Sequence, residues 1–509
     1  MAKKPNVILI TTDQQRGDCI GPEGRGVITP NMDRIAQRGV RFRTCITPHP
    51  MCQAARASIL TGKLPYSHGV RDNGRDLDEA LAEQGLGGTF TAAGYATHFI
   101  GKAHLSSQQT FHPTGRPECY QSAADFGPDW TGSYMGFQDV QLMLRPHHHT
   151  KWSDPPESLH YEDWLDQDGQ GGARWQRAKD RLEPDTAHFQ AWRSGLDKEW
   201  HSTEWIGDRA VRMVQDKGDR PLMAWVSFPD PHPPFLSPRP WCDMYDDTPV
   251  TIAKHPELDL DRRPWWHRAF VEDRAKPIKQ GAEHNAGGID WGQKGELTEQ
   301  ALQDLTRIYF GMISAVDHQI GRILDTLEQQ GELDNTIIVF TSDHGEWLGD
   351  HGLLLKGPML YDGLLRVPCM ICGPGVAAGQ VLDDPVGTID ILATLADLAG
   401  ITVAPSHGRS WRGLWEGRET REFALSEYEV DACRSAVDMD LMTVRSRRYR
   451  MSVDMRTMTG EMYDLQDDPD EMTNLFDDPT HRDLREDHLR MIRTRPDDMI
   501  PVSPRVGWH

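Results

Sequence analysis

Pro5-Asn6-Val7-Ile8-Leu9-Ile10-Thr11-Thr12-Asp13-Gln14 is the stretch of sequence that decides the fold. A short apolar run of this kind is typical of a central parallel strand that is buried on both faces, so we expect a strand over 6–12. Open α/β sheets bind their ligands just beyond the carboxyl ends of the strands. Asp13 and Gln14 follow the run directly, and the sequence therefore predicts a binding group at this edge.

Further strands and helices alternate along the chain. We expect strands over 96–100, 221–228 and 336–341 and helices over 30–39, 302–329 and 388–400. Alternating strands and helices are typical of an α/β fold with a doubly wound, mostly parallel sheet. We assign residues 1–400 to this catalytic domain and 401–509 to a smaller C-terminal α+β subdomain, with two strands, a turn and a terminal helix.

Two long segments interrupt the predicted α/β domain, near 107–200 and 238–296. They are rich in Trp, His, Pro and Asp and lack a clear periodicity, which favours functional insertions over structural ones. The run His147-His148-His149 lies in the first, where a solvated loop is favoured over a metal site. Trp152, Trp265 and Trp266 could line an aromatic-tolerant pocket, or equally pack in the core or at an oligomer contact.

Charge and cysteine content exclude several classes of function. The chain has 55 basic and 77 acidic residues, a net charge of −22, which argues against nucleic acid or an anionic membrane as the main partner. Eight cysteines are too sparse for a disulfide scaffold. Cys369 and Cys372 lie in an apolar run without a second cysteine pair, so we expect a structural role.

The N-terminus predicts the compartment. Its apolar run is too short for a signal peptide, and no segment of the chain approaches transmembrane length. We therefore expect a cytoplasmic protein without a membrane partner. A homo-oligomer is also expected, and a dimer is the commonest form.

Cys52 begins the run Cys52-Gln53-Ala54-Ala55-Arg56, which indicates chemistry. If Gln53 opens a helix, free backbone N–H groups and the positive helix end face an anion bound beside Cys52. Arg56, one turn on, lies on the same face and can reach an oxyanion there. The alternative is an ordinary buried cysteine.

A second polar pair follows a later strand. Asp343 and His344 come after the strand over 336–341, as Asp13 and Gln14 come after the first, so both pairs fall on one edge of the sheet. Two carboxylates, an amide oxygen and an imidazole can bind one divalent cation. The oxygen-rich set favours Ca²⁺, and the imidazole also suits Mn²⁺.

Four more polar residues follow strand ends or the metal pair. Lys102 and His104 come after the second strand, His232 after the third, and Lys356 downstream of Asp343. Surface lysines and core histidines are the ordinary alternative. That alternative does not explain why all four side chains fall near one edge of the sheet.

Together these motifs resemble the type I sulfatases of the alkaline phosphatase superfamily, over nearly the whole chain. The matching segments are 5–14, 29–33, 52–62, 101–104, 342–356 and 460–475. The resemblance implies an alkaline phosphatase-like fold and a hydrolase of sulfate monoesters of the arylsulfatase kind. It also implies that a formylglycine-generating enzyme oxidises Cys52 to formylglycine, whose hydrated aldehyde is the nucleophile.

The resemblance assigns the residues that would bind the metal. Asp13, Gln14, Asp343 and His344 would bind the metal together with the converted Cys52.

It likewise assigns the groups that act on the substrate. Arg56 would hold the nucleophile's hydroxylate. Lys102, His232 and Lys356 would bind the sulfuryl oxygens, with His232 or Lys356 protonating the leaving oxygen. His104 would bind the second hydroxyl and later remove its proton, so that the covalent sulfate ester breaks down.

The chain departs from the family pattern at three places. Ala54 stands where the family's Cys-x-Pro-x-Arg has proline, which affects how well the maturation enzyme converts Cys52. Gln14 and His344 replace an Asp and an Asn and resemble phosphonate monoester hydrolases. Those hydrolases generally lack the pair formed here by Lys102 and His104.

We give Lys102 and His104 more weight, because they touch the transferred group. The lead interpretation is therefore a sulfatase with side activity on phosphonate monoesters and phosphodiesters. The first alternative makes phosphonate monoester or phosphodiester hydrolysis the main activity. The second is a non-catalytic protein that binds sulfated ligands, if Cys52 stays a thiol.

Overall fold

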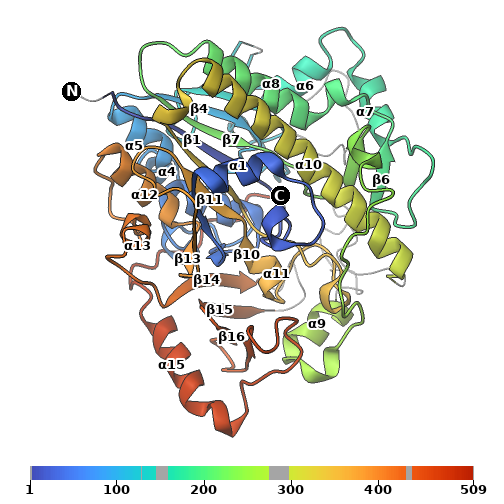
Figure 1. Ribbon diagram of the computed structural model, residues 1–509, viewed down its shortest axis with the longest axis vertical. Helices are drawn as coiled ribbons and strands as arrows, with labels where there is room; N and C mark the ends of the chain where they lie inside the picture. The colour runs from blue at the N-terminus through green and yellow to red at the C-terminus, as the bar shows by residue number, and fades with distance from the viewer. Residues whose placement is uncertain (1–2, 128, 145–158, 274–296, 431–437, 508–509) are drawn as a thin grey trace.

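The computed structural model describes residues 3–127, 129–144, 159–273, 297–430 and 438–507. Its centre is an eight-stranded sheet (Figure 1). In spatial order the strands are β12 (Gln380–Leu382), β2 (Gly39–Phe42), β11 (Cys369–Cys372), β9 (Thr336–Ser342), β1 (Asn6–Thr12), β7 (Leu222–Ser227), β4 (Ala96–Gly101) and β5 (Asp139–Leu142). The run from β9 to β5 is parallel, and β11 is antiparallel to both of its neighbours. The four strands expected from the sequence are confirmed, and so is the mostly parallel sheet.

Side chains of β1 alternate between two hydrophobic layers. Ile8 and Ile10 pack into one layer, while Val7 and Leu9 pack into the other. The first layer also holds residues of α1 (Pro30–Arg38), α8 (Ser202–Gln215) and α10 (Glu299–Gln329). The second holds residues of α2 (Cys52–Thr61), α5 (Leu86–Ala92) and α12 (Asp390–Ala399). Burial on both faces explains the uninterrupted apolar sequence of the strand.

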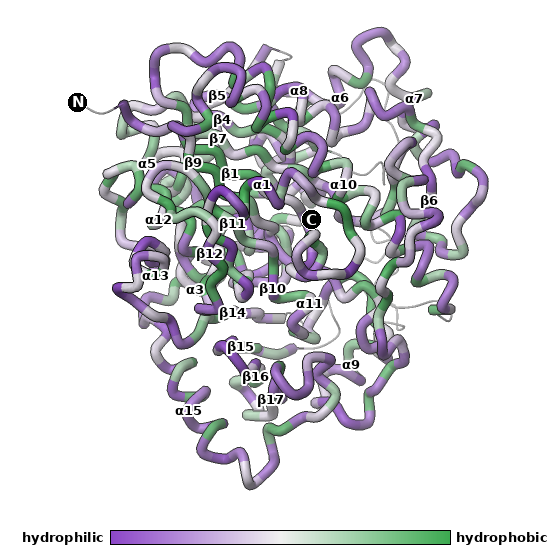
Figure 2. The backbone as a smooth tube through the Cα atoms, viewed as in Figure 1, coloured by the Kyte–Doolittle hydropathy of each residue, from purple (hydrophilic) through white to green (hydrophobic). Residues whose placement is uncertain are grey.

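Hydropathy follows the same layering. Figure 2 shows hydrophobic residues concentrated in the central strands and hydrophilic ones in the outer loops. Cys369 and Cys372 lie buried in β11, in agreement with a structural role. Among the residues that the structure describes, no helix is both long and apolar enough to cross a membrane.

The first predicted insertion contains more regular structure than its sequence suggested. β5 falls within it and forms the sheet edge beside β4. It also contains α6 (His160–Leu165), α7 (Gly171–Lys179) and β6 (Ala191–Ser194). The run 147–149 and Trp152 lie outside the described residues. Of the two tryptophans in the second insertion, Trp266 is fully buried in a hydrophobic cluster and Trp265 is exposed.

The C-terminal region forms a separate four-stranded antiparallel sheet (Figure 1). Its strands are β14 (Phe423–Val430), β15 (Met439–Ser446), β16 (Tyr449–Asp454) and β17 (Gly460–Asp464), and α15 (Arg482–Arg493) packs against it through a shared apolar cluster. The smaller C-terminal subdomain is confirmed. The prediction of two strands is too low, because this sheet has four.

Residues 500–507 return to the main body and run along the loop 69–75. The backbone N–H of Ser503 donates to Gly69 at 2.9 Å, and that of Val506 donates to Gly74 at 2.9 Å. Arg505 also forms an ion pair with Asp72 at 3.0 Å. The end of the described chain therefore holds a loop that lies beside the start of α2.

Candidate active site

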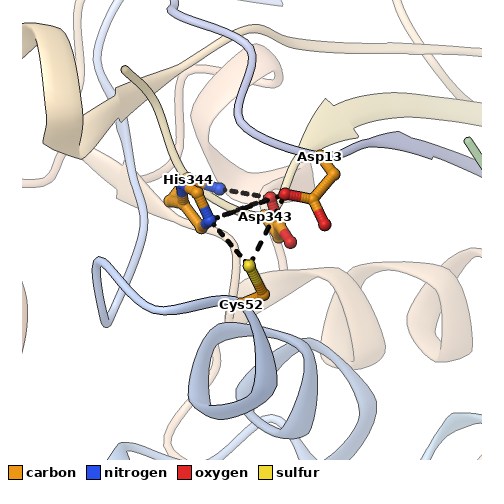
Figure 3. A group of neighbouring side chains, drawn as sticks. All are labelled: Asp13, Cys52, Asp343 and His344. Carbon is orange, nitrogen blue, oxygen red and sulfur yellow. Dashed lines mark hydrogen bonds and ion pairs between the residues drawn. The ribbon is translucent and has the colours of Figure 1, made fainter. Parts of the chain in front are cut away.

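The two polar pairs meet at the carboxyl edge of the sheet. β1 and β9 are paired in parallel as far as Thr12 and Ser342, so the residues that follow them lie side by side. The backbone N–H of Gln14 donates to Asp343 Oδ1 at 3.0 Å. One ligand atom from each of four fully buried residues, Asp13, Cys52, Asp343 and His344, lies within 4.8 Å of the others (Figure 3).

Cys52 enters this group from the first residue of α2, one position earlier than the sequence suggested. Its Sγ lies 3.1 Å from His344 Nε2, 3.6 Å from Asp13 Oδ1 and 2.8 Å from Lys356 Nζ. Burial raises the pKa of the Cys52 thiol, with a further increase from Asp13 and an opposing effect of Lys356. The side chain thus lies at the point where acidic and basic groups meet.

The first turn of α2 is held by the loop 69–75. Asn73 Oδ1 accepts the backbone N–H of Gln53 at 3.1 Å. The Gln53 side chain accepts from Gly74 N at 2.8 Å and donates to Arg75 O at 2.8 Å. The bond to Asn73 satisfies one of the free N–H groups at the helix start, and the two side-chain bonds hold Gln53 against the loop.

His344 has the tautomer that a metal ligand needs. Its Nδ1 donates to the Gly345 carbonyl at 2.9 Å, so the lone pair of Nε2 faces Asp13 and Cys52. Burial, followed by the charge of Lys356, lowers the pKa of His344 to about 4. The imidazole is therefore neutral at neutral pH, and this donor set fits a divalent cation.

Gln14 is oriented by a residue that the motifs did not reveal. Its Nε2 donates to Glu346, while its Oε1 lies 2.9 Å from Lys356 Nζ on the side of the metal-binding group. Glu346 also accepts the backbone N–H groups of Leu348 and Leu355. Burial raises the pKa of Glu346 to about 7. In the sequence, the position of Glu346 two residues after His344 was the only indication that it belongs near the site.

Arg56 joins the two carboxylates. Its Nε donates to Asp343 Oδ2 at 2.9 Å, and Nη2 lies 3.3 Å from Asp13 Oδ2. Nη1 donates to the Lys102 carbonyl and to Ser227 Oγ, both at 2.7 Å. Ser227, the last residue of β7, was not expected at the site, because a serine at a strand end carries no distinctive pattern.

Lys102 completes the charge balance around Asp13. Its Nζ lies 2.5 Å from Asp13 Oδ2, and both side chains are buried. Burial alone would raise the pKa of Asp13. The charges of Lys102, His232, Arg56 and Lys356 outweigh this effect and hold the pKa well below its usual range. Asp13 is therefore ionised at neutral pH.

His104 and His232 lie at the same edge of the sheet. His232 is buried and close enough to Asp13 to lower its pKa, and its Nδ1 donates to the Pro233 carbonyl at 2.7 Å. His104 is buried two residues beyond Lys102 and has a φ of 49°. Gln14 has a φ of 68°. Backbone strain of this kind gathers at functional sites, because only the surrounding structure can maintain it.

The structure therefore brings most of the predicted residues into one cluster, and it places His104 at the same edge of the sheet through its backbone. Direct side-chain contacts connect most of them, and His232 acts on Asp13 through its charge. Lys102, Arg56 and Lys356 supply three positive charges against two carboxylates. Such a group suits a bound anion and a metal together.

Comparisons with known proteins agree with this geometry. The family described as Sulfatase matches residues 5–401, and that described as N-sulphoglucosamine sulphohydrolase, C-terminal, matches residues 349–495. The chain is 30% identical to an arylsulfatase of Clostridium perfringens, over 96% of this chain and 93% of the relative. It is 29% identical to a choline-sulfatase of Rhizobium meliloti, over 96% and 87%.

A solved structure extends the likeness to a second activity. The phosphonate monoester hydrolase of Agrobacterium radiobacter superposes with a TM-score of 0.72 and 25% identity, covering 96% of each chain. The matched segments include every residue of the cluster around Cys52. The chain belongs to the sulfatase family, within the alkaline phosphatase superfamily.

Proposed function

We propose that this sulfatase cleaves sulfate monoesters at the cluster around Cys52. The observation that carries the proposal is the convergence of Arg56, Lys102 and Lys356 on the ionised Asp13 and on the Cys52 side chain. The whole chain has a net charge of −22, so an anionic substrate must be attracted locally. A tetrahedral sulfate ester is the kind of anion that such a buried cationic group binds.

Asp13, Gln14, Asp343, His344 and the modified Cys52 are the residues proposed to hold one divalent cation. Ca²⁺ is favoured by the oxygen donors, and Mn²⁺ is the alternative that the imidazole allows. Such an ion supplies a Lewis acid that polarises the oxygens bound to it. The protein's part is to keep the donors in place, through Arg56 on both carboxylates and Glu346 on the Gln14 amide.

Cys52 is proposed to act after conversion to formylglycine by a formylglycine-generating enzyme, which supplies a hydrated aldehyde as the nucleophile. Lys102, His232 and Lys356 bind the sulfuryl oxygens, and His232 or Lys356 protonates the leaving oxygen. His104 removes the proton of the second hydroxyl. Arg56 holds the nucleophile's oxygen as well as the carboxylates. The expected homodimer remains a prediction from the sequence.

The first experiment is peptide mass spectrometry across Cys52, on protein co-produced with the maturation enzyme. We expect a peptide carrying formylglycine, and C52A should lose turnover of a sulfate ester while keeping the wild-type fold by circular dichroism. Unmodified thiol alone would favour a protein that binds sulfated ligands. Sulfatase activity in C52A would remove Cys52 as the nucleophile.

Phosphonate monoester or phosphodiester hydrolysis is the second candidate function. It is favoured by Gln14 and His344 in the metal-binding group and by the likeness to the Agrobacterium hydrolase. Values of kcat/KM on a 4-nitrophenyl sulfate, phosphonate and phosphodiester would compare the activities with one leaving group. We expect the sulfate to be the best substrate, and a more efficient phosphonate would reverse the assignment.

A further inference from the structure

Three consecutive backbone N–H groups converge on the carboxylate of Glu118. Those of Leu105 and Ser106 donate to Oε2 at 2.9 and 3.0 Å, and that of His104 donates to Oε1. The hydroxyl of Tyr134 donates to the same carboxylate at 2.8 Å. Glu118 is fully buried. An ionised carboxylate accepts hydrogen bonds only, so these donors fix the segment 104–106 in one conformation.

This segment continues directly from a residue that is fixed in the active site. The backbone N–H of Lys102 donates to the Ser227 carbonyl at 3.1 Å, and its own carbonyl accepts from Arg56 at 2.7 Å. Its ammonium contacts Asp13 at 2.5 Å. The chain between Lys102 and the Glu118 carboxylate therefore has fixed ends, and His104 lies between them.

His104 needs such support, because its φ of 49° is unfavourable for a side chain other than glycine. Burial raises the pKa of Glu118, while the hydrogen bonds from Ser106, Tyr134, Leu105 and His104 lower it. A buried carboxylate whose acceptor atoms all serve one short turn has a clear structural effect, which is to maintain that turn.

We propose that Glu118 is a positioning residue for His104, whose strained backbone it holds in the one conformation that orients the imidazole for its proposed task. This inference rests on the proposed function, which gives His104 the task of removing a proton. Glu118 itself touches neither substrate nor metal in this scheme. It acts through His104, and Tyr134 supports it through the hydroxyl hydrogen bond.

The test is a double-mutant cycle between E118Q and H104A, on protein with formylglycine content and bound metal measured. Glutamine keeps the shape of the side chain but turns an N–H₂ group toward one of the donors. We expect E118Q to lower kcat on a sulfate ester about 10- to 100-fold with little change in KM. In the H104A background the same change should have no further effect, because it acts through the missing imidazole.

Glu162 provides a matched control within the same part of the chain. It is also fully buried and accepts backbone N–H groups, from Leu144 at 3.0 Å and Leu159 at 3.2 Å. E162Q should keep the wild-type kcat. If E162Q lowers kcat as much as E118Q does, or if E118Q costs the same factor with and without His104, then Glu118 is only a structural residue and the inference is wrong.

Y134F keeps the proposal testable if E118Q does not fold, because it removes one donor and leaves the carboxylate in place. We expect about a 2- to 10-fold lower kcat, again absent in the H104A background. Full turnover in H104A would remove the proposed role of His104 and this inference with it. If E118Q or Y134F lowers kcat by the same factor with and without His104, the inference about Glu118 is wrong, while the proposed function still stands.

Discussion

Two buried histidines beside α2 remain uncharged in the folded protein. His68 Nε2 lies 2.9 Å from Ser58 Oγ, and its Nδ1 accepts the backbone N–H of Val70 at 3.2 Å. Burial, with a smaller effect of His49, lowers the pKa of His68 to about 3. The pKa of His49 is also lowered to about 3, mainly by burial. Both imidazoles lie within the structure that supports the Cys52 helix.

His68 therefore predicts a loss of stability in mild acid. The unfolded chain binds a proton at this histidine below a pKa of about 6.5, whereas the folded chain does not until about pH 3. The contribution is fully present above pH 6.5, and it falls by about 1.4 kcal/mol for each pH unit below that value. Urea unfolding at several values between pH 7.5 and 5 measures the slope.

H68Q should reduce this slope by the equivalent of one proton. H112Q, at an exposed position, is the control and should keep the slope of the wild type. An unchanged slope in H68Q would mean that His68 is protonated in the folded protein as readily as in the unfolded chain.

Single residues differ in how far their sequence context reveals them. Asp13, Lys102 and Asp343 could be placed together because each follows a strand, and parallel strands end at one edge. Glu118 and Ser227 could not, because their partners are backbone N–H groups and an arginine that only the folded chain brings near. The catalytic roles themselves remain predictions until the variants are measured.

The start of helix α2 indicates that proline would also fit at position 54. Ala55 is the residue whose N–H first bonds back to the helix start, to the Met51 carbonyl at 3.0 Å. Ala54 precedes it, among the first-turn N–H groups that have no partner inside a helix. Proline fits such a position without losing a helical hydrogen bond.

We therefore expect A54P to leave the melting temperature within a few degrees of the wild type and to increase the converted fraction of Cys52. Peptide mass spectrometry on protein made with a limiting amount of the maturation enzyme measures that fraction. A55P is the matched control, since it removes the bond to Met51 and costs about 3 kcal/mol of stability. If A54P destabilises the protein as much as A55P, the first turn is more constrained than its hydrogen bonds indicate.

Elements were predictable where their sequence pattern was long. β1, β9 and the 31-residue α10 have extended apolar patterns and were located within a few residues. β5 has only four residues, which is too short for its alternating pattern to distinguish it from a loop in the sequence. β14 contains two glutamates, which form ion pairs with Arg495 and Arg71. Because charged residues interrupt its apolar pattern, the sequence did not predict this strand.

At the scale of the whole molecule, the proposed metal-binding group connects the edge of the central sheet with the helix layer on one of its faces. Its residues directly follow β1 and β9 or begin α2, which packs on one face of the sheet. An ion that binds only the folded chain stabilises it by about 2.7 kcal/mol at one hundred times its dissociation constant. We therefore expect EDTA to lower the melting temperature, and Ca²⁺ or Mn²⁺ to restore it.

Calorimetry with elemental analysis of the same samples identifies the ion, as the one that restores both the melting temperature and the bound metal. D13N should melt at the same temperature with and without EDTA. Wild-type protein that contains no metal and melts identically in EDTA would contradict the proposed site.

The hydrogen bonds of residues 500–507 to the loop 69–75 have a consequence for the order of events during synthesis. Every residue of α2 is buried, Cys52 included, so the proposed oxidation of Cys52 requires a chain in which this region has not finished folding. Arg505 lies 433 residues after its partner Asp72. At 5–20 residues per second, the ribosome needs roughly 20 to 90 s to cover that distance. The loop beside Cys52 thus lacks its final support throughout that interval, and we expect the proposed oxidation of the cysteine to take place within it.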